Sequence, residues 1–206
     1  LADIDDKKLL LTIGKDGILW KLDREKGNFI DLKETINQNI YKKVDRNMGK
    51  VFYRDDILFS KIDTPFSACP GIYGGHNWQA VSYDPENHLM VIPLHQLCAD
   101  MIGRYVERKE GGGGYGGNSR NYKMDNTNGK VGKLVTIDIK NMEKMWQYEQ
   151  DAMFLTGSLT TSGGLTFIGD LDRKFMAFDT KTGKLLWDTT LGSALHGFPI
   201  TYGVNG

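Results

Sequence analysis

The chain has 206 residues, and its 26 Lys and Arg balance 26 Asp and Glu, so that it carries no formal net charge. A neutral chain without a basic stripe lacks the electrostatic footprint of a nucleic-acid-binding protein, and no apolar run approaches the ~20 residues of a membrane-spanning helix. Glycine contributes 25 residues, well above its average usage of roughly 7%, which favours a turn-rich, all-β chain.

The expected elements, in chain order, are short apolar strands separated by turns. Residues 9–13 and 18–22 flank the turn Gly14-Lys15-Asp16-Gly17 and predict a first hairpin. Further strands are predicted at 89–92, 134–137, 165–168 and 175–178. The best helix candidate is the stretch 34–48, but no segment of a dozen residues keeps a 3.6-residue apolar period.

A repeat with a period near 40 residues runs through the second half of the chain. Its clearest copy, residues 177–187, reads Ala-Phe-Asp-Thr-Lys-Thr-Gly-Lys-Leu-Leu-Trp. A second copy at 136–146 lies 41 residues earlier and has the same eight-residue spacing from Asp to Trp. A degenerate copy at 21–30 keeps the Asp and the Gly but loses the Trp. Four short strands per unit of this length are typical of a β-propeller, with Trp146 and Trp187 wedged between neighbouring sheets.

Two regions interrupt this pattern, at about 34–68 and 99–130, and are interpreted as loop insertions in a single domain 1–206. The second region contains the tract 111–117, in which six of the seven residues are glycine. Such a tract cannot pack and is expected to be a mobile loop. It lacks the Gly-Lys-Ser/Thr of a phosphate-binding loop.

The two cysteines, Cys69 and Cys98, are compatible with two buried free thiols or with one disulfide. The residues alone leave both possibilities open. No Cys-x-x-Cys or paired Cys/His spacing predicts a zinc site. His76 has no potential ligand partner at a useful spacing, and we expect a turn or core histidine there.

The repeat Ala-x-Asp-x-x-Thr-Gly-Lys-x-x-Trp resembles the tryptophan-docking motif of the eight-bladed quinoprotein alcohol dehydrogenases, which use pyrroloquinoline quinone (PQQ). Three further segments resemble this family and occur in its order: Cys-Pro-Gly-Ile-Tyr-Gly-Gly-His-Asn-Trp-Gln at 69–79, and the segments 161–172 and 191–202. The resemblance implies an all-β fold, namely a partial eight-bladed propeller with about three blades and one strand of the closing blade.

The resemblance also implies a set of cofactor-binding residues. Lys15 lies in a turn that matches the family's Lys/Arg-Asn-Gly turn, whose cation reaches the quinone oxygens. Asn77 would donate its amide to the edge of the cofactor, and Trp78, Leu195 and His196 would line the site. From the residues alone, an exposed hairpin lysine is the favoured interpretation of Lys15, a turn former is the alternative for Asn77, and Trp78 is equally a core residue.

Two more features follow from the resemblance. Family members bridge the cysteines that correspond to Cys69 and Cys98, which implies a disulfide and a periplasmic location. The Trp that forms the floor of the cofactor site in methanol- and ethanol-oxidising members is Leu155 here, with Phe154 beside it. This departure implies either a different cofactor sandwich or a substrate other than a simple alcohol.

The implied function is oxidation of an alcohol or aldehyde by hydride transfer to PQQ, with electrons passing to cytochrome c or ubiquinone. The family's Ca²⁺ or lanthanide ligands and catalytic Asp lie upstream of the Lys15 turn, and only 14 residues precede Lys15. We therefore expect no catalytic residue or metal ligand in this chain, which would be inactive without its N-terminal half. The alternative is a non-enzymatic propeller that serves as a protein-interaction scaffold, which would have no reason to keep Lys15 and Asn77.

Overall fold

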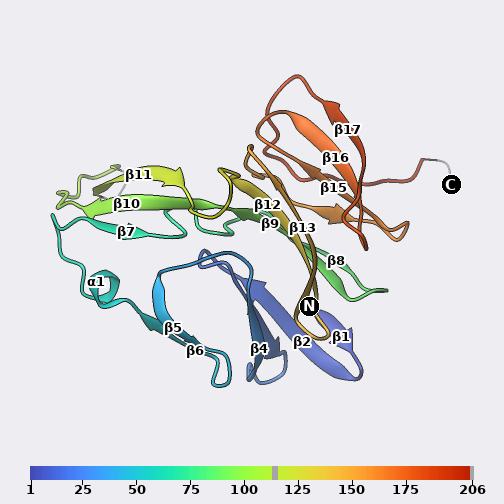
Figure 1. Ribbon diagram of the computed structural model, residues 1–206, viewed down its shortest axis with the longest axis horizontal. Helices are drawn as coiled ribbons and strands as arrows, with labels where there is room; N and C mark the ends of the chain where they lie inside the picture. The colour runs from blue at the N-terminus through green and yellow to red at the C-terminus, as the bar shows by residue number, and fades with distance from the viewer. Residues whose placement is uncertain (113–115, 205–206) are drawn as a thin grey trace.

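The computed structural model describes residues 1–112 and 116–204. Within this part of the chain all strand pairs are antiparallel, and the only α-helix is the single turn α1 (Asp55–Leu58). The all-β prediction is confirmed (Figure 1). No helix in the described residues is long and apolar enough to cross a membrane.

Three four-stranded sheets carry the fold, and we call them the first, second and third sheet in chain order. The first consists of β1 (Ala2–Ile4), β2 (Lys7–Ile13), β3 (Ile18–Asp23) and β4 (Phe29–Glu34). The second consists of β8 (Ser82–Asp84), β9 (Leu89–His95), β12 (Gly132–Asp138) and β13 (Glu143–Gln150). The third consists of β14 (Leu159–Thr160), β15 (Leu165–Gly169), β16 (Lys174–Asp179) and β17 (Leu185–Thr190). All the predicted strands lie in these sheets.

Two smaller sheets occupy the regions that interrupt the repeat. One pairs β5 (Tyr41–Asp45) with β6 (Lys50–Tyr53). The other has the order β11 (Gly117–Lys123), β10 (Leu97–Gly103), β7 (Phe66–Ala68) and projects away from the four-stranded sheets, at the left of Figure 1. Part of the predicted mobile glycine tract, residues 113–115, lies outside the described residues.

Two expectations are wrong. Residues 34–48 form the end of β4, an extended connection and β5, because the side-by-side pairing of β5 with β6 supplies hydrogen bonds that a helix would otherwise make. Residues 191–204 contain no strand, so the expected strand of a closing blade is absent from the described residues. This segment instead begins against the third sheet, where Leu191 N donates to Arg173 O.

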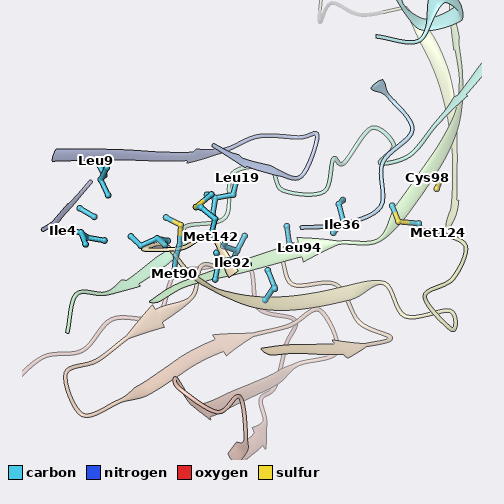
Figure 2. Packing of buried hydrophobic residues seen from close by; sticks show 14 residues of the cluster. Ile4, Leu9, Leu19, Ile36, Met90, Ile92, Leu94, Cys98, Met124 and Met142 are labelled. Atoms are coloured by element: carbon cyan, nitrogen blue, oxygen red, sulfur yellow. The ribbon is translucent and has the colours of Figure 1, made fainter. Parts of the chain in front are cut away.

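The core forms on both faces of the second sheet, because every residue of β9 is buried and neighbouring side chains point to opposite faces. Ile92 faces the first sheet and joins the cluster that contains Leu9 and Leu19 (Figure 2). Val91 faces the third sheet and packs in a cluster with Phe178. Each fully buried Leu, Ile or Phe contributes roughly 1.5–3 kcal/mol of hydrophobic stabilisation, so face-to-face packing of successive sheets holds the chain together.

The second and third sheets are joined by Trp146. Its indole Nε1 donates to Thr180 O at 2.8 Å, and its ring lies flat against Gly183, where a Cβ would overlap the indole. Trp146 pairs with Thr136 and Trp187 with Ala177, so the two tryptophans occupy equivalent positions, as predicted.

The expectation that both tryptophans are wedged between sheets holds for Trp146 alone. Trp187 is 50% exposed, because no sheet of the described chain follows the third one. Its aromatic contact is with Phe175 of its own sheet, edge to face at 6.3 Å.

The first and second sheets are joined by lysines where the degenerate repeat lacks its Trp. Lys21 donates its ammonium to Ile139 O at 2.8 Å and Lys140 O at 3.0 Å. In the opposite direction, Lys133 donates to Thr35 O at 2.9 Å. Both lysines are buried, and burial lowers the pKa of each ammonium.

Candidate functional site

The turn 14–17 places Lys15 at one end of the first sheet. Asp16 Oδ1 accepts from Ile18 N at 3.1 Å, and its Oδ2 accepts from the Tyr41 hydroxyl at 3.0 Å. Burial raises the pKa of Tyr41, so the hydroxyl keeps its proton and remains a donor. The turn is therefore held by its own aspartate and by β5, whereas the Lys15 side chain is exposed.

The segment 71–75 lies directly against this turn. Lys15 Nζ donates to Ile72 O at 2.9 Å, and Lys15 O accepts from Gly75 N at 2.7 Å. Gly74 has a φ of +78°, and a Cβ there would lie 2.7 Å from the Lys15 Cβ. Gly74 is thus required because a larger residue would push the segment away from Lys15, and a Cβ at Gly75 would overlap the Ile36 side chain.

Residues 76–79 place Asn77 and Trp78 at the surface, beside the buried side chain of Gln79. Gln79 Oε1 accepts from the backbone N–H of Asn77 at 3.1 Å, and Gln79 is 2% exposed. The Asn77 side chain is exposed. Trp78 is 50% exposed, so the interpretation of Trp78 as a core residue is wrong.

The segment 195–198 reaches the same end of the molecule. Phe198 contacts Trp78 edge to face, with ring centroids 5.8 Å apart. Leu195 N donates to Asp170 O at 3.0 Å, and the Leu195 side chain packs over Gly169. A cavity of about 330 Å³ lies here, and its walls include Leu195, His196 and Phe198.

These contacts place the predicted site residues on three segments. The turn 14–17 touches the segment 71–75, and Trp78 touches Phe198, so the three segments form a continuous row of contacts. Within the described residues, no hydrogen bond joins the Lys15 or Asn77 side chain to the segment 195–198. The convergence of the Lys15 ammonium and the Asn77 amide on one ligand stays a prediction.

Leu155, predicted to stand where the family has its floor Trp, and its neighbour Phe154 differ in exposure. Phe154 is completely buried in the core between the second and third sheets. Leu155 is half-buried. Phe154 is therefore a core residue, and only Leu155 can face a ligand.

The disulfide between Cys69 and Cys98 is confirmed, with Cα atoms 4.3 Å apart. Cys69 also makes two hydrogen bonds with Asn39. The backbone N of Asn39 donates to Cys69 O, and Asn39 Oδ1 accepts from the backbone N of Cys69, both at 2.7 Å. Gly71 N donates to Leu97 O at 2.8 Å. The disulfide and these bonds fix the start of the segment that carries Asn77.

Sequence reasoning missed Gln79 and His95. His95 is completely buried at the end of β9, and its Nε2 lies 3.0 Å from Gln79 Nε2 and 2.9 Å from Phe154 O. Burial lowers the pKa of the His95 imidazole. No local pattern connects these residues, because 16 positions separate Gln79 from His95.

His76 is a buried core histidine, as predicted, and its Nδ1 lies 2.9 Å from Pro93 O. Burial lowers the pKa of its imidazole, which keeps it neutral. Across residues 1–112 and 116–204, no group of three or more His, Cys, Asp and Glu could hold a metal ion.

Comparison with known sequences supports the sequence-based resemblance. The family described as "Glucose/ethanol/alcohol dehydrogenase, beta-propeller domain" matches residues 117–206. Quinohemoprotein alcohol dehydrogenase from Comamonas testosteroni is 29% identical over 100% of the chain and 30% of the relative. Methanol dehydrogenase [cytochrome c] subunit 1 from Paracoccus denitrificans is 30% identical over 98% of the chain and 33% of the relative. Lanthanide-dependent methanol dehydrogenase from Methylacidiphilum fumariolicum is 28% identical over 94% of the chain and 32% of the relative.

Solved structures agree with these sequence matches. A europium-containing methanol dehydrogenase superposes with a TM-score of 0.86 at 26% identity, covering 96% of this chain and 35% of the other. Quinohemoprotein alcohol dehydrogenase from Comamonas testosteroni superposes with a TM-score of 0.82 at 25% identity, covering 99% and 32%. The chain thus spans about a third of the length of the relatives it matches. Residues 117–206 therefore match the β-propeller domain of the PQQ-dependent alcohol dehydrogenase family, and the whole chain is similar in sequence and fold to about a third of the alcohol and methanol dehydrogenases that carry this domain.

Proposed function

We propose that this chain is the C-terminal part of a PQQ-dependent dehydrogenase that oxidises an alcohol or an aldehyde by hydride transfer to the quinone. The observation that carries the proposal is the direct contact between the Lys15 turn and the segment that presents Asn77. A cation and an amide donor are thereby held at one end of neighbouring sheets, on a scaffold whose relatives are named as alcohol and methanol dehydrogenases.

The residues of this end fit the chemistry of PQQ. PQQ is a flat ortho-quinone with three carboxylates, so its site needs cations, amide donors and an apolar surface. The Lys15 ammonium donates one of its three N–H groups to Ile72 O. The other two remain available for quinone or carboxylate oxygens. The exposed Asn77 amide and the half-exposed Trp78 ring supply the other two features. When bound, PQQ supplies a two-electron acceptor that no amino-acid side chain provides.

Each of these residues would act by position and charge. The Lys15 ammonium would stabilise the negative charge that develops on a quinone oxygen during reduction, an electrostatic effect of roughly 3–4 kcal/mol for a single well-placed donor. Because Ile72 O already orients Lys15, little reorganisation is needed at the moment of reaction. The Asn77 amide would fix the in-plane orientation of the ring, which a flexible lysine stem does not do.

The rest of the enzyme supplies what this chain lacks. We place the Ca²⁺ or lanthanide ligands and the catalytic Asp in the N-terminal half of the propeller. We place the enzyme in the periplasm, which is supported by the disulfide between Cys69 and Cys98. The electron acceptor is cytochrome c or ubiquinone, of which the first is supported by relatives named for cytochrome c. Leu155 at the position of an aromatic floor supports either a different sandwich of the cofactor or a substrate other than a simple alcohol.

The test uses the full-length protein that carries this chain, titrated with PQQ and then with Ca²⁺ or La³⁺. We expect alcohol- or aldehyde-dependent dye reduction that requires both PQQ and metal. Lys15→Ala should lower kcat on the order of 10²–10³-fold with little change in thermal stability. The matched control is Lys26→Ala, an equally exposed lysine in the β3–β4 turn, which should leave kcat unchanged. A full-length protein that binds no PQQ would be a scaffold and would refute the proposal.

A further inference from the structure

We infer that Gln79 and His95 are positioning residues for the proposed cofactor site, which they serve by fixing the loop that presents Asn77. The inference rests on the proposed function and concerns two side chains that do not themselves face the ligand. Both are almost completely buried, with exposed fractions of 2% for Gln79 and 0% for His95. Buried polar groups of this kind are costly unless they satisfy one another or the backbone.

Gln79 acts on Asn77 directly. Its Oε1 accepts from the Asn77 backbone N–H at 3.1 Å, which sets the direction in which the exposed Asn77 side chain leaves the loop. Gln79 Nε2, the other polar atom of this amide, lies 3.0 Å from His95 Nε2. With the His95 proton on Nδ1, Nε2 accepts from the Gln79 amide N–H, so the Gln79 carboxamide is held at both ends and supports the loop two positions from Asn77.

His95 ties the same loop to the remainder of the site. Its backbone N donates to Gly75 O at 2.7 Å, and its Nε2 lies 2.9 Å from Phe154 O in the connection between the second and third sheets. Thr156 lies two residues further along this connection, and its Oγ1 donates to Gly169 O at 2.7 Å. The Leu195 side chain packs over Gly169. His95 therefore lies between the Asn77 loop, to which its backbone is hydrogen-bonded, and the connection that supports Leu195, which its ring contacts.

The second nitrogen of His95 takes no part in this arrangement. Nδ1 is buried and has no hydrogen-bond partner within the described residues. The atom that contacts both neighbours is consequently Nε2, which accepts from the Gln79 amide when the proton is on Nδ1 and donates to Phe154 O when the proton is on Nε2, making one of the two hydrogen bonds at a time. This asymmetry gives a test in which two conservative substitutions of His95 have opposite outcomes.

The first experiment measures the Kd of PQQ for the full-length protein by absorbance titration, together with the Tm of the apoprotein. Gln79→Leu should weaken PQQ binding by about tenfold or more, because the Asn77 N–H loses its acceptor. Asn77→Ala added to Gln79→Leu should cause no further loss, because Gln79 acts through Asn77. The control is Gln96→Leu, which removes an equally buried glutamine whose amide binds Lys130 O, and it should leave the Kd unchanged.

The second experiment compares His95→Gln with His95→Asn. A glutamine amide reaches the position of Nε2 and should keep PQQ affinity within about threefold of the wild type, whereas an asparagine amide occupies the position of Nδ1 and should weaken binding about tenfold or more. The comparison of the two His95 variants tests the positioning role even if Gln79→Leu fails to give a cooperative unfolding transition.

Different results refute the proposed function and the positioning role. Wild-type protein that binds no PQQ refutes the proposed function itself. Wild-type protein that binds PQQ, with Gln79→Leu equal to Gln96→Leu, overturns the positioning role. Additive losses in the Gln79→Leu/Asn77→Ala cycle, or equal affinities for His95→Gln and His95→Asn, also overturn it.

Discussion

A methyl group added to Gly183 should cost far more stability than the same methyl group added to Gly27. The two glycines occupy the same position of equivalent turns, with φ of +71° and +72°. An alanine at either site is forced into a left-handed conformation at a cost of roughly 1–2 kcal/mol. At Gly27 nothing lies within 4 Å of the new Cβ, whereas at Gly183 the Cβ would overlap the indole of Trp146.

The additional loss at Gly183 can be estimated from the contacts of Trp146. A displaced indole gives up its hydrogen bond to Thr180 O, a net contribution of about 1 kcal/mol. It also gives up part of its stacking on Phe178, with centroids 6.2 Å apart, and overpacking at such a site costs about 1–3 kcal/mol. Gly183→Ala should therefore destabilise the chain by roughly 3–6 kcal/mol, and Gly27→Ala by roughly 1–2 kcal/mol.

The assay is urea unfolding of the 206-residue chain, followed by tryptophan fluorescence and far-UV circular dichroism. In a Trp146→Ala background the overlap disappears, so Gly183→Ala should then cost only the roughly 1–2 kcal/mol of backbone strain. Equal losses for Gly183→Ala and Gly27→Ala in the wild-type background would refute the docking of Trp146 on Gly183.

Two further predictions concern the disulfide and a buried lysine. Replacing both Cys69 and Cys98 by Ala should cost about 3–4 kcal/mol in urea unfolding, because the bridge closes a loop with a sequence separation of 29; a loss below ~1 kcal/mol would contradict this. Burial lowers the pKa of Lys133 from its ordinary value of 10.5, so the folded chain releases this proton at lower pH than the unfolded chain. The contribution of Lys133 to stability should therefore rise as pH approaches 10.5, and Lys133→Met should remove that rise from the pH profile; identical profiles would exclude a depressed pKa.

The sequence by itself determined the local structure. The short apolar runs 9–13 and 18–22 and the Gly-Lys-Asp-Gly turn between them predicted β2 and β3, because both features depend on residues close together in the chain. The Asp-to-Trp spacing predicted that Trp146 and Trp187 are equivalent, and their registers confirm it. The disulfide was predicted only through the family resemblance, since the residues alone were equally compatible with free thiols.

Only the tertiary structure decided what the side chains contact. Within the stretch 34–48, residues Tyr41–Asp45 form the strand β5 because β6, outside that window, supplies their partner. Trp146 is docked on Gly183 while the equivalent Trp187 is half exposed, a difference set by which sheet lies beside each one. The contact between Gln79 and His95 could likewise not be predicted, because sheet packing brings together groups that local sequence patterns do not connect. Burial and pairing across sheets depend on contacts that are distant in sequence, whereas propensity and turn chemistry act within a few residues.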